Sequence, residues 1–341
     1  MEGAKNMGGG LQVGGLALAG RALLAPMAGS TDAAMRGIAE RYGAAAAVNE
    51  MVTASGLARD DRETRVRLSL KNKIGPRVIQ IAARDEVEIA AAARRAVDAG
   101  ADWIDINMGC PCKRVTGGLA GAALMRDLDH AARLVAAATN AVAAPVSVKM
   151  RLGWDDKSRN APQLARRVEA EGAKLVTVHA RTREQFYSGA ANWTAIAAVK
   201  QAVRIPVVAN GDCASPQGAA QMLRESGADA VMIGRAALGQ PWLVGDVALY
   251  LSTRRLRPPP SAAERLAVAL EHLEGLCSAL GVAQGLRHAR KHLAAYVDRV
   301  VFPASESHAE RRRAMLECAE LRVVKDRLTR LMLSETCEAA T

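Results

Sequence analysis

The chain has 341 residues, with 46 Lys and Arg against 35 Asp and Glu, so its formal net charge is +11. This length excludes a single small module and fits a barrel of about 250 residues with an additional domain. The 50% apolar content excludes a disordered chain, and the charge suits a polyanionic partner, although an aromatic content of 3% argues against rows of base-stacking side chains.

Eight short apolar runs lie in the first 235 residues, each separated from the next by a longer Ala-rich segment with helical spacing. We predict strands at residues 22–25, 45–49, 78–81, 103–106, 146–149, 176–179, 207–209 and 230–233. The predicted helices between them include residues 85–98, 127–138, 162–171, 194–203 and 216–226. This alternation of strand and helix is typical of a parallel sheet.

The residues that precede these runs alternate in type. A glycine followed by alanine precedes every even-numbered run, at Gly43, Gly100, Gly172 and Gly227, and a proline precedes the others from the third onward, at Pro76, Pro145 and Pro206. We expect the four glycines to end helices in the left-handed conformation. A pattern that repeats every two strand–helix units favours a closed (β/α)8 TIM barrel over an open doubly wound sheet.

The character of the sequence changes after Tyr250. Residues 252–261 read STRRLRPPPS, a basic and proline-rich segment that can continue neither a helix nor a central strand. From residue 262 onward the apolar residues have helical spacing. We therefore predict a barrel domain in residues 1–250, a linker in 251–261 and a small C-terminal helical bundle domain in 262–341.

Polar residues follow nearly every predicted strand, at the end where TIM barrels build their active sites. They are Met27, Asn49, Glu50, Gln80, Asn107, Lys149, Arg151, His179, Arg181, Asn210, Gly211, Asp212, Gly234 and Arg235, with Met27 the one apolar member. Some of them could be helix caps or loop formers. Their presence at so many strand ends favours an active site.

Two features of this set suit a phosphate. Gly211 and Gly234 follow the seventh and eighth strands, where barrels often bind phosphate through backbone N–H groups, and Arg235 adds a positive charge. Lys149 has several possible roles: a Schiff-base amine, an anchor for a carbonyl or phosphate, or a cation that stabilises a reduced flavin. Its position alone does not choose among them.

Cys110 lies on a glycine-rich loop just after the fourth strand. Its thiol could be a nucleophile, a metal ligand or a general acid, and Lys113 and Arg114 are close enough in sequence to favour a thiolate or polarise a substrate. A metal is poorly supported, because Cys110 and Cys112 have no second Cys or His pair at metal-binding spacing. We predict no metal site.

The six cysteines show no spacing typical of secreted proteins, and no apolar run is long enough for a signal peptide or a membrane span. We therefore expect reduced thiols in a cytoplasmic protein that does not enter a membrane. We expect a monomer with no stable protein partner.

Nine segments resemble bacterial tRNA-dihydrouridine synthases, nearest the B-type subgroup. They are APMAGSTD (25–32), NEMV (49–52), QIAARD (80–85), DINMGCPCKRVTGGLAGAALMRD (105–127), VKMRLGW (148–154), VHARTREQFYSGAANW (178–193), NGD (210–212), IGRAALGQPW (233–242) and RKHLAAY (290–296). The first eight occur in register from about residue 20 to residue 245. Several motifs that match in order make the resemblance specific.

The resemblance implies an FMN enzyme that uses NADPH to reduce the C5=C6 bond of particular uridines in tRNA to 5,6-dihydrouridine. The implied flavin contacts are Pro26, Met27, Ala28, Gln80, Lys149, His179, Asn210, Gly211, Asp212, Gly234 and Arg235. The implied catalytic residue is Cys110, with Asn107 and Arg181 at the substrate. Cys112 departs from the family, where a small residue is usual, and raises the question of an oxidised Cys110–Cys112 form.

The implied reaction suits a thiol. Hydride addition from flavin N5 to C6 of uracil leaves enolate character that needs a proton at C5. A thiol with an ordinary pKa of about 8.5 can supply this proton at neutral pH. Lys149 can stabilise the anionic flavin.

Basic residues of the C-terminal segment provide a candidate RNA surface. Arg287, Arg290 and Lys291 stand at positions i, i+3 and i+4 of a predicted helix, and further basic clusters lie at 311–313 and 325–330. We predict that the first three bind the tRNA backbone, the alternative being an ordinary solvated helix face.

Three other functions stay open at this point. One is an FMN barrel that reduces a free pyrimidine or an enoate, which leaves the basic helical segment unexplained. Another is a Schiff-base aldolase built on Lys149, and the third is a non-catalytic barrel that binds tRNA.

Overall fold

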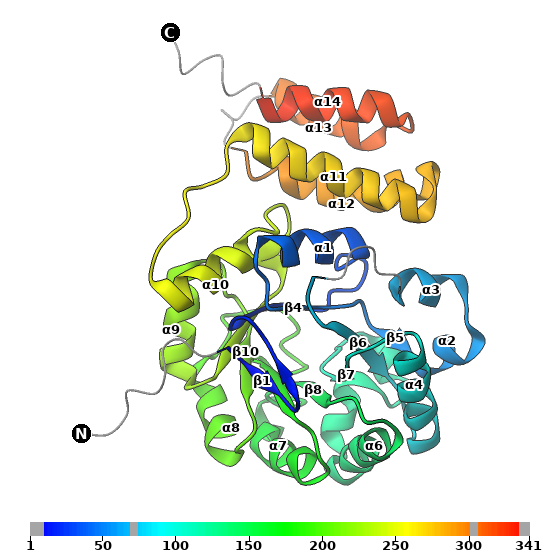
Figure 1. Ribbon diagram of the computed structural model, residues 1–341, viewed down its shortest axis with the longest axis vertical. Coiled ribbons are helices and arrows are strands. Elements are labelled where there is room, and N and C mark those ends of the chain that lie inside the picture. Colours follow the sequence, from blue (N-terminus) through cyan, green and yellow to red (C-terminus); the bar gives the residue numbers. More distant parts are fainter. Residues whose placement is uncertain (1–9, 69–73, 301–305, 334–341) are drawn as a thin grey trace.

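Eight parallel strands close into a barrel in the computed structural model, which describes residues 10–68, 74–300 and 306–333 (Figure 1). The strands are β3 (Ala22–Leu24), β4 (Ala46–Val48), β6 (Arg77–Ala82), β7 (Trp103–Met108), β8 (Val146–Arg151), β9 (Leu175–His179), β10 (Val207–Asn210) and β11 (Ala230–Ile233). Each strand pairs in parallel with the next, and β11 pairs with β3 to close the sheet. The predicted TIM barrel is confirmed.

Helices surround the barrel and connect its strands. They are α1 (Ala33–Tyr42), α2 (Ala54–Arg59), α3 (Arg62–Leu68), α4 (Glu86–Asp98), α6 (Leu128–Ala141), α7 (Ala161–Ala170), α8 (Ala197–Ala202), α9 (Pro216–Ser226) and α10 (Leu243–Thr253). The glycines that precede β4, β7, β9 and β11 have φ angles of 112°, 90°, 94° and 63°. The expectation that these glycines adopt the left-handed conformation is therefore confirmed.

The second predicted strand is interrupted in the structure. Residues 45–49 contribute only β4, and the chain resumes pairing with β6 at a separate short strand, β5 (Val52–Thr53). Between them the side-chain oxygen of Asn49 accepts the N–H of Gln80 at 2.6 Å. The Asn49 side chain thus takes the place of a backbone acceptor for this N–H. The interruption leaves Glu50 free to turn toward the loop after β3, where it accepts the N–H of Gly29.

A short hairpin closes the N-terminal end of the barrel. It consists of β1 (Gln12–Val13) and β2 (Leu16–Ala17), which pair antiparallel. Leu11, Val13 and Leu18 are buried against side chains of the barrel interior that include Trp103 and Leu23. The hairpin was not predicted, because strands of two residues are too short to show an alternating pattern.

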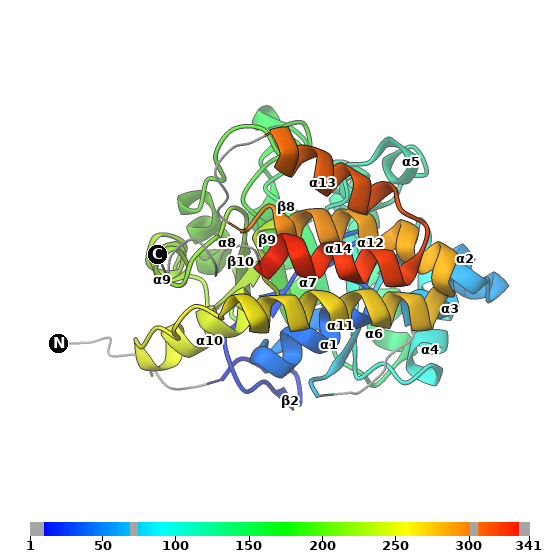
Figure 2. The ribbon, with the colours of Figure 1, turned by 90° about the horizontal axis from the view of Figure 1, so that it is seen from above.

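The C-terminal region is helical, as predicted. Helix α10 continues through Thr253, into the segment predicted as linker, and residues 254–261 then lead to α11 (Ala262–Leu280). The helices that follow are α12 (Val282–Val297), α13 (Glu306–Glu317) and α14 (Leu321–Leu333). Figures 1 and 2 show α11 and α12 between the barrel and the pair α13 and α14.

These four helices share a second apolar core, which includes Leu273, Leu293 and Leu328. The same core takes in Ile38 of α1 and Trp242 from the segment before α10, so the helical region packs directly on the barrel. Two glycines permit a close approach of the backbones. A Cβ atom at Gly239 would lie 2.2 Å from the carbonyl oxygen of Ala295, and one at Gly275 would lie 2.7 Å from the Cβ of Ala34.

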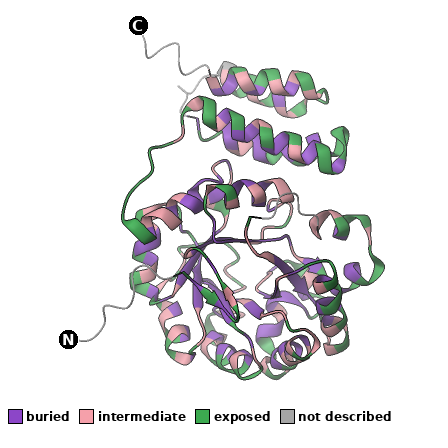
Figure 3. Cartoon of the chain, viewed as in Figure 1, coloured by how far each residue is buried: buried purple, intermediate pink, exposed green. Residues whose placement is uncertain are grey.

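Burial is concentrated in the strands and in the inward faces of the helices (Figure 3). None of the helices in the described parts of the chain combines the length and the apolar character needed to cross a membrane.

Candidate active site

A cavity of about 460 Å³ opens at the C-terminal ends of β3 and β8–β11. It is lined by Ala25, Pro26, Met27, Lys149, His179, Tyr187, Asn210, Gly211, Asp212, Cys213, Ala214, Gly234, Arg235, Ala236 and Arg299. The structure therefore brings together nine of the residues predicted to contact a cofactor. Ala28 is exposed on the loop after β3, and Gln80 is buried beneath the cavity in β6; neither belongs to its lining.

Lys149 is the central cation of the cavity. It projects from β8, and its Nζ donates to the side-chain oxygen of Asn210 on β10 at 3.0 Å. Asn210 is itself fixed, because its amide nitrogen donates to the carbonyl of Met232 at 2.9 Å. Burial, with a contribution from nearby Arg151, lowers the pKa of Lys149 to about 8. The ammonium form therefore still predominates at neutral pH.

His179, at the end of β9, is an uncharged neighbour of Lys149. Burial and the positive charges of Lys149 and Arg151 lower the pKa of His179 to about 2. Its ring lies 6.1 Å from the ring of Tyr187, centroid to centroid. At neutral pH this imidazole can therefore offer hydrogen bonds but no charge.

A buried carboxylate, Asp105, organises the floor of the site. Its two oxygens accept hydrogen bonds from Ser147 at 2.5 Å and from the amide of Gln80 at 2.7 Å. The oxygen of Gln80 in turn accepts from the amide of Asn107 at 2.7 Å. No role was predicted for Asp105, although it is the first residue of the motif DINMGCP, which resembles the family. Its function is to fix the orientation of Gln80.

Both the nitrogen and the oxygen of the Asn107 side-chain amide form hydrogen bonds within the protein. Beside the hydrogen bond to Gln80, its oxygen accepts the N–H groups of Gly109 at 3.2 Å and Cys110 at 2.9 Å. Asn107 therefore shapes the loop that carries Cys110. Its predicted contact with the substrate stays a prediction.

Cys110 is half-buried on this loop, and both it and Cys112 are free thiols. Burial raises the pKa of the Cys110 thiol, against smaller opposing effects that include the charges of Arg151 and Lys149. The expectation that Lys113 and Arg114 favour a thiolate is wrong. They lie exposed on α5 (Lys113–Thr116), which turns them toward solvent, so Cys110 holds its proton at neutral pH.

Arg181 is almost entirely buried, with 2% of its side chain exposed. Its guanidinium donates to both carboxylate oxygens of Asp212, at 3.0 and 2.5 Å, and to the carbonyls of Ser188 and Gly189. Arg235 reaches the same carboxylate at 3.4 Å. In this structure Arg181 therefore orders the loop after β9, and its predicted contact with the substrate stays a prediction.

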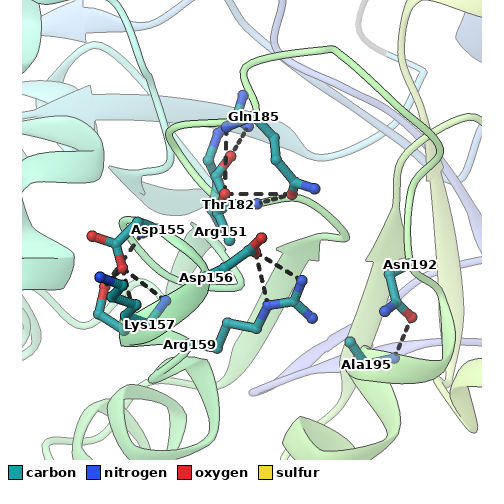
Figure 4. Close-up of polar contacts among 10 residues, drawn as sticks. Arg151, Asp155, Asp156, Lys157, Arg159, Thr182, Gln185, Asn192 and Ala195 are labelled. Carbon is teal, nitrogen blue, oxygen red and sulfur yellow. Dashed lines mark hydrogen bonds and ion pairs between the residues drawn. The ribbon is translucent and has the colours of Figure 1, made fainter.

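Arg151 links the loops that follow β7 and β9. It is 1% exposed and donates to the carbonyls of Gly109, Thr182 and Phe186, each at 2.8 Å. Figure 4 shows neighbouring contacts in the loops that follow β8 and β9, among them the hydrogen bond from the N–H of Thr182 to the side-chain oxygen of Gln185 at 2.7 Å. Arg151 thus holds the Cys110 loop against the rim of the cavity.

Six residues of the cavity lining were not predicted from the sequence, among them Tyr187 and Arg299. Tyr187 lies in the quoted motif REQFYSG, and the guanidinium of Arg235 stacks 4.6 Å from the centroid of its ring. Arg299 lies just after α12 of the helical region and donates to the carbonyl of Ala236 at 3.1 Å. No local pattern could have placed Arg299 in a cavity formed by strands of the barrel.

The three predicted RNA-binding residues lie exposed on α12. Lys291 points to the mouth of the barrel, since a Cβ atom at Gly29 would lie 2.7 Å from its Nζ. Arg287 and Arg290 form no ion pair with any residue that the structure describes. Their charges are therefore available to a ligand.

The fold and this pocket define a TIM-barrel enzyme with a cation-rich site at the strand ends. The profile of the dihydrouridine synthase (Dus) family matches residues 23–335. The chain therefore belongs to the dihydrouridine synthase family, which confirms the resemblance seen in the sequence and the prediction of an enzyme.

Relatives and solved structures agree with this assignment. A probable tRNA-dihydrouridine synthase of Rhizobium leguminosarum bv. phaseoli is 49% identical over 82% of this chain and 86% of its own length. A tRNA-dihydrouridine synthase B of Xanthomonas campestris is 48% identical over 84% and 86%. Among solved structures, morphinone reductase has a TM-score of 0.54 at 14% identity, covering 77% of this chain and 94% of that one, which shows a shared fold.

Proposed function

We propose that this protein reduces the C5=C6 bond of specific uridines in tRNA to 5,6-dihydrouridine, with FMN as its flavin and NADPH as its reductant. Membership of the dihydrouridine synthase family carries this proposal. The names of the Rhizobium and Xanthomonas relatives support tRNA as the substrate. The protonated thiol of Cys110, close to a cavity with the half-buried Lys149, supports a reduction completed by proton transfer.

The residues of the cavity fit a flavin mononucleotide. The volume of the cavity, about 460 Å³, falls within the range of small-molecule sites. Lys149, Arg235 and Arg299 supply positive charge for a phosphate and an electron-rich ring, and Met27 and Tyr187 supply apolar surface. When bound, FMN would supply the hydride that is added to C6 of uracil.

The residues of the chain would then act as follows. The thiol of Cys110 donates its proton to C5 of uracil, a role that its raised pKa favours because the protonated form predominates at neutral pH. Lys149 presents a positive charge that stabilises a reduced anionic flavin. Neutral His179 and Asn210 offer hydrogen bonds, and Asp105 keeps Gln80 in a fixed orientation.

The helical region suits the macromolecular substrate. Removal of a uridine from its stack in folded tRNA costs a few kcal/mol, which contacts to the RNA backbone must offset. Arg287, Arg290 and Lys291 on α12 offer such contacts. We assign residues 1–250 to catalysis, 251–261 to a linker and 262–341 to tRNA binding, in a cytoplasmic monomer.

The decisive experiment follows the oxidation of the reduced flavin. The purified protein should be yellow, NADPH should reduce its flavin, and unmodified tRNA should reoxidise that flavin under anaerobic conditions. Free uridine and a simple enoate should not. Reoxidation by either small molecule at the rate seen with tRNA would instead support the alternative reductase, and a colourless protein would contradict the proposal.

A further inference from the structure

A buried polar cluster joins the helical region to the barrel. Asp32, at the start of α1, faces His272 of α11 and His292 of α12. Its Oδ2 lies 3.0 Å from Nε2 of His272 and 3.3 Å from Nε2 of His292, and the two imidazoles are 1% and 2% exposed. We call Asp32, His272, His292 and Tyr296 the interdomain cluster.

His272 holds the interdomain cluster together by hydrogen bonds, whereas His292 contacts Asp32 only at ion-pair distance. His272 bridges two partners, since its Nδ1 lies 3.2 Å from the hydroxyl of Tyr296. The two imidazole rings are tilted by 44° with centroids 4.2 Å apart. Burial alone would raise the pKa of Asp32, but the two imidazoles hold it well below its ordinary value, so the carboxylate is ionised. Two helices of the C-terminal region thus converge on one buried charge.

Asp32 also belongs to the loop that was predicted to contact the flavin. Its second oxygen, Oδ1, caps α1 by accepting the N–H groups of Ala34 at 2.9 Å and Met35 at 3.0 Å. The preceding residue, Thr31, accepts the N–H of Met27 at 2.7 Å and donates to the carbonyl of Ala25 at 2.9 Å. A displacement of Asp32 therefore changes the path of residues 25–31.

The helix that carries His292 also carries the predicted RNA-binding residues. Lys291 is its immediate neighbour and reaches Gly29 in the same loop. The N–H of Gly29 donates to Glu50 at 2.5 Å, so the loop is held between the barrel and α12. One helix therefore has exposed cations on one side and, on the other, a fixed contact with the flavin loop.

We propose that Asp32, His272 and His292 are positioning residues that couple tRNA binding on α12 to flavin binding by residues 25–31. This inference rests on the proposed function. RNA contacts that hold α12 in place hold Asp32, and Asp32 holds the flavin loop in its binding conformation. Because a coupling free energy is reciprocal, tRNA must tighten flavin binding by the same factor by which flavin tightens tRNA binding.

The test measures the rate at which flavin leaves the full-length yellow protein after dilution, with and without unmodified tRNA. The recovery of flavin fluorescence reports this release. In the unaltered protein we expect tRNA to slow release by roughly 5-fold or more, the lower end of typical couplings. Asp32→Asn retains an oxygen that can cap α1 but removes the charge shared by the imidazoles. In this variant the ratio of the two release rates should fall close to one.

Asp127→Asn is the matched control. Asp127 caps α6 by accepting the N–H of His130 at 2.9 Å, in an exposed position outside the interdomain cluster. This exchange should leave the tRNA effect on flavin release as in the unaltered protein. His292→Phe provides a second test if Asp32→Asn fails to fold, because it keeps a flat ring beside His272 and should also lose the coupling.

Three results would overturn the inference: no effect of tRNA on release from the unaltered protein, a full effect in both variants, or stoichiometric zinc in the purified protein. Zinc would make the same three side chains metal ligands, whose ligand atoms already lie within 4.8 Å of one another. If the protein forms dihydrouridine but tRNA has no effect on flavin release, the proposed coupling is contradicted and the proposed function is not. If the purified protein contains no flavin and forms no dihydrouridine, the proposed function itself is contradicted.

Discussion

The cavity at the strand ends and the exposed side of α12 both carry positive charge, but they hold it differently. In the cavity, Lys149 and the adjoining Arg151 and Arg181 are fixed by partners within the chain. On α12, Arg287 and Arg290 are exposed and form no ion pair with a described residue. The first arrangement fixes geometry, and the second supplies charge that adapts to a ligand.

This difference predicts different responses to substitution. A change in the cavity breaks a specific geometry and should have a large effect that depends on the position. A change on α12 removes one charge among several and should have a small effect that depends on salt concentration.

The largest effect is expected at Cys110. Cys110→Ala removes the proposed proton donor, and loss of a general acid typically lowers a rate about 10² to 10⁴-fold. The variant should still bind flavin and consume NADPH with oxygen. Quantification of dihydrouridine in tRNA by mass spectrometry measures the loss.

Cys112→Ala is the control for this substitution, because Cys112 is exposed two residues away. It should form dihydrouridine at the normal rate. Normal product formation by Cys110→Ala would show that another group donates the proton.

The next effect is expected at Asp105. Asp105→Asn replaces an acceptor with an amide that cannot accept the hydrogen bonds of both Ser147 and Gln80. The free energy of unfolding should fall by about 1 to 3 kcal/mol, and turnover should fall roughly 10-fold as Gln80 loses its orientation. Chemical denaturation and flavin reoxidation rates measure the two effects.

Asp229→Asn separates stability from function. Asp229 accepts the N–H of Val207 at 2.8 Å and pairs with Lys200, at the end of the barrel opposite the cavity. This exchange should lower stability alone. Equal losses of turnover in both variants would show that Asp105 acts only through folding.

An effect of similar size, on affinity alone, is expected from the titration of Lys149. Because its pKa in the flavin-free protein is about 8, its charge is present below that pH and is lost above it. FMN affinity should therefore fall roughly 10-fold between pH 7 and pH 9, as one charge-assisted interaction disappears. Titration by quenching of flavin fluorescence measures the change.

Lys149→Met should bind FMN weakly and with no pH dependence over this range. Lys200→Met, which removes a lysine paired with Asp229 away from the cavity, should retain the pH dependence of the unaltered protein. If the FMN affinity of Lys149→Met still depended on pH, a group other than Lys149 would be responsible.

The smallest effect per residue is expected on α12. Joint replacement of Arg287, Arg290 and Lys291 by alanine should reduce the slope of log affinity for tRNA against log salt concentration by about 2. Filter binding at several salt concentrations measures this slope. A charge-matched control replaces Arg94, Arg166 and Arg224 on the outer helices of the barrel, where the slope should not change. Equal slopes for the two triple variants would place the RNA elsewhere.

Local patterns were sufficient to predict the framework of the fold. The strand positions and the left-handed glycines depend on neighbouring residues, so the sequence predicted them. Nine of the fifteen residues that line the cavity were also predicted, because most of them follow strand ends that meet at one mouth. The hairpin at 12–17 and the interruption between β4 and β5 were missed, because their strands are too short to show a pattern.

Contacts between distant residues could not be predicted in this way. Asp105 and Gln80 are 25 positions apart, and Asp32 and His272 are 240 positions apart. No spacing rule connects such pairs. Sequence proximity also misled in one case, since Lys113 lies three positions from Cys110 in the chain but is exposed on α5 and is not among the charges that shift the pKa of Cys110.

Two glycines, one on each side of the contact between the barrel and the helical region, limit how this architecture can change. Because Gly239 and Gly275 let backbone and small side chains meet directly, the angle between the helical region and the barrel is set by steric exclusion. A chimera that receives the helical region of a relative must therefore retain small residues at both positions.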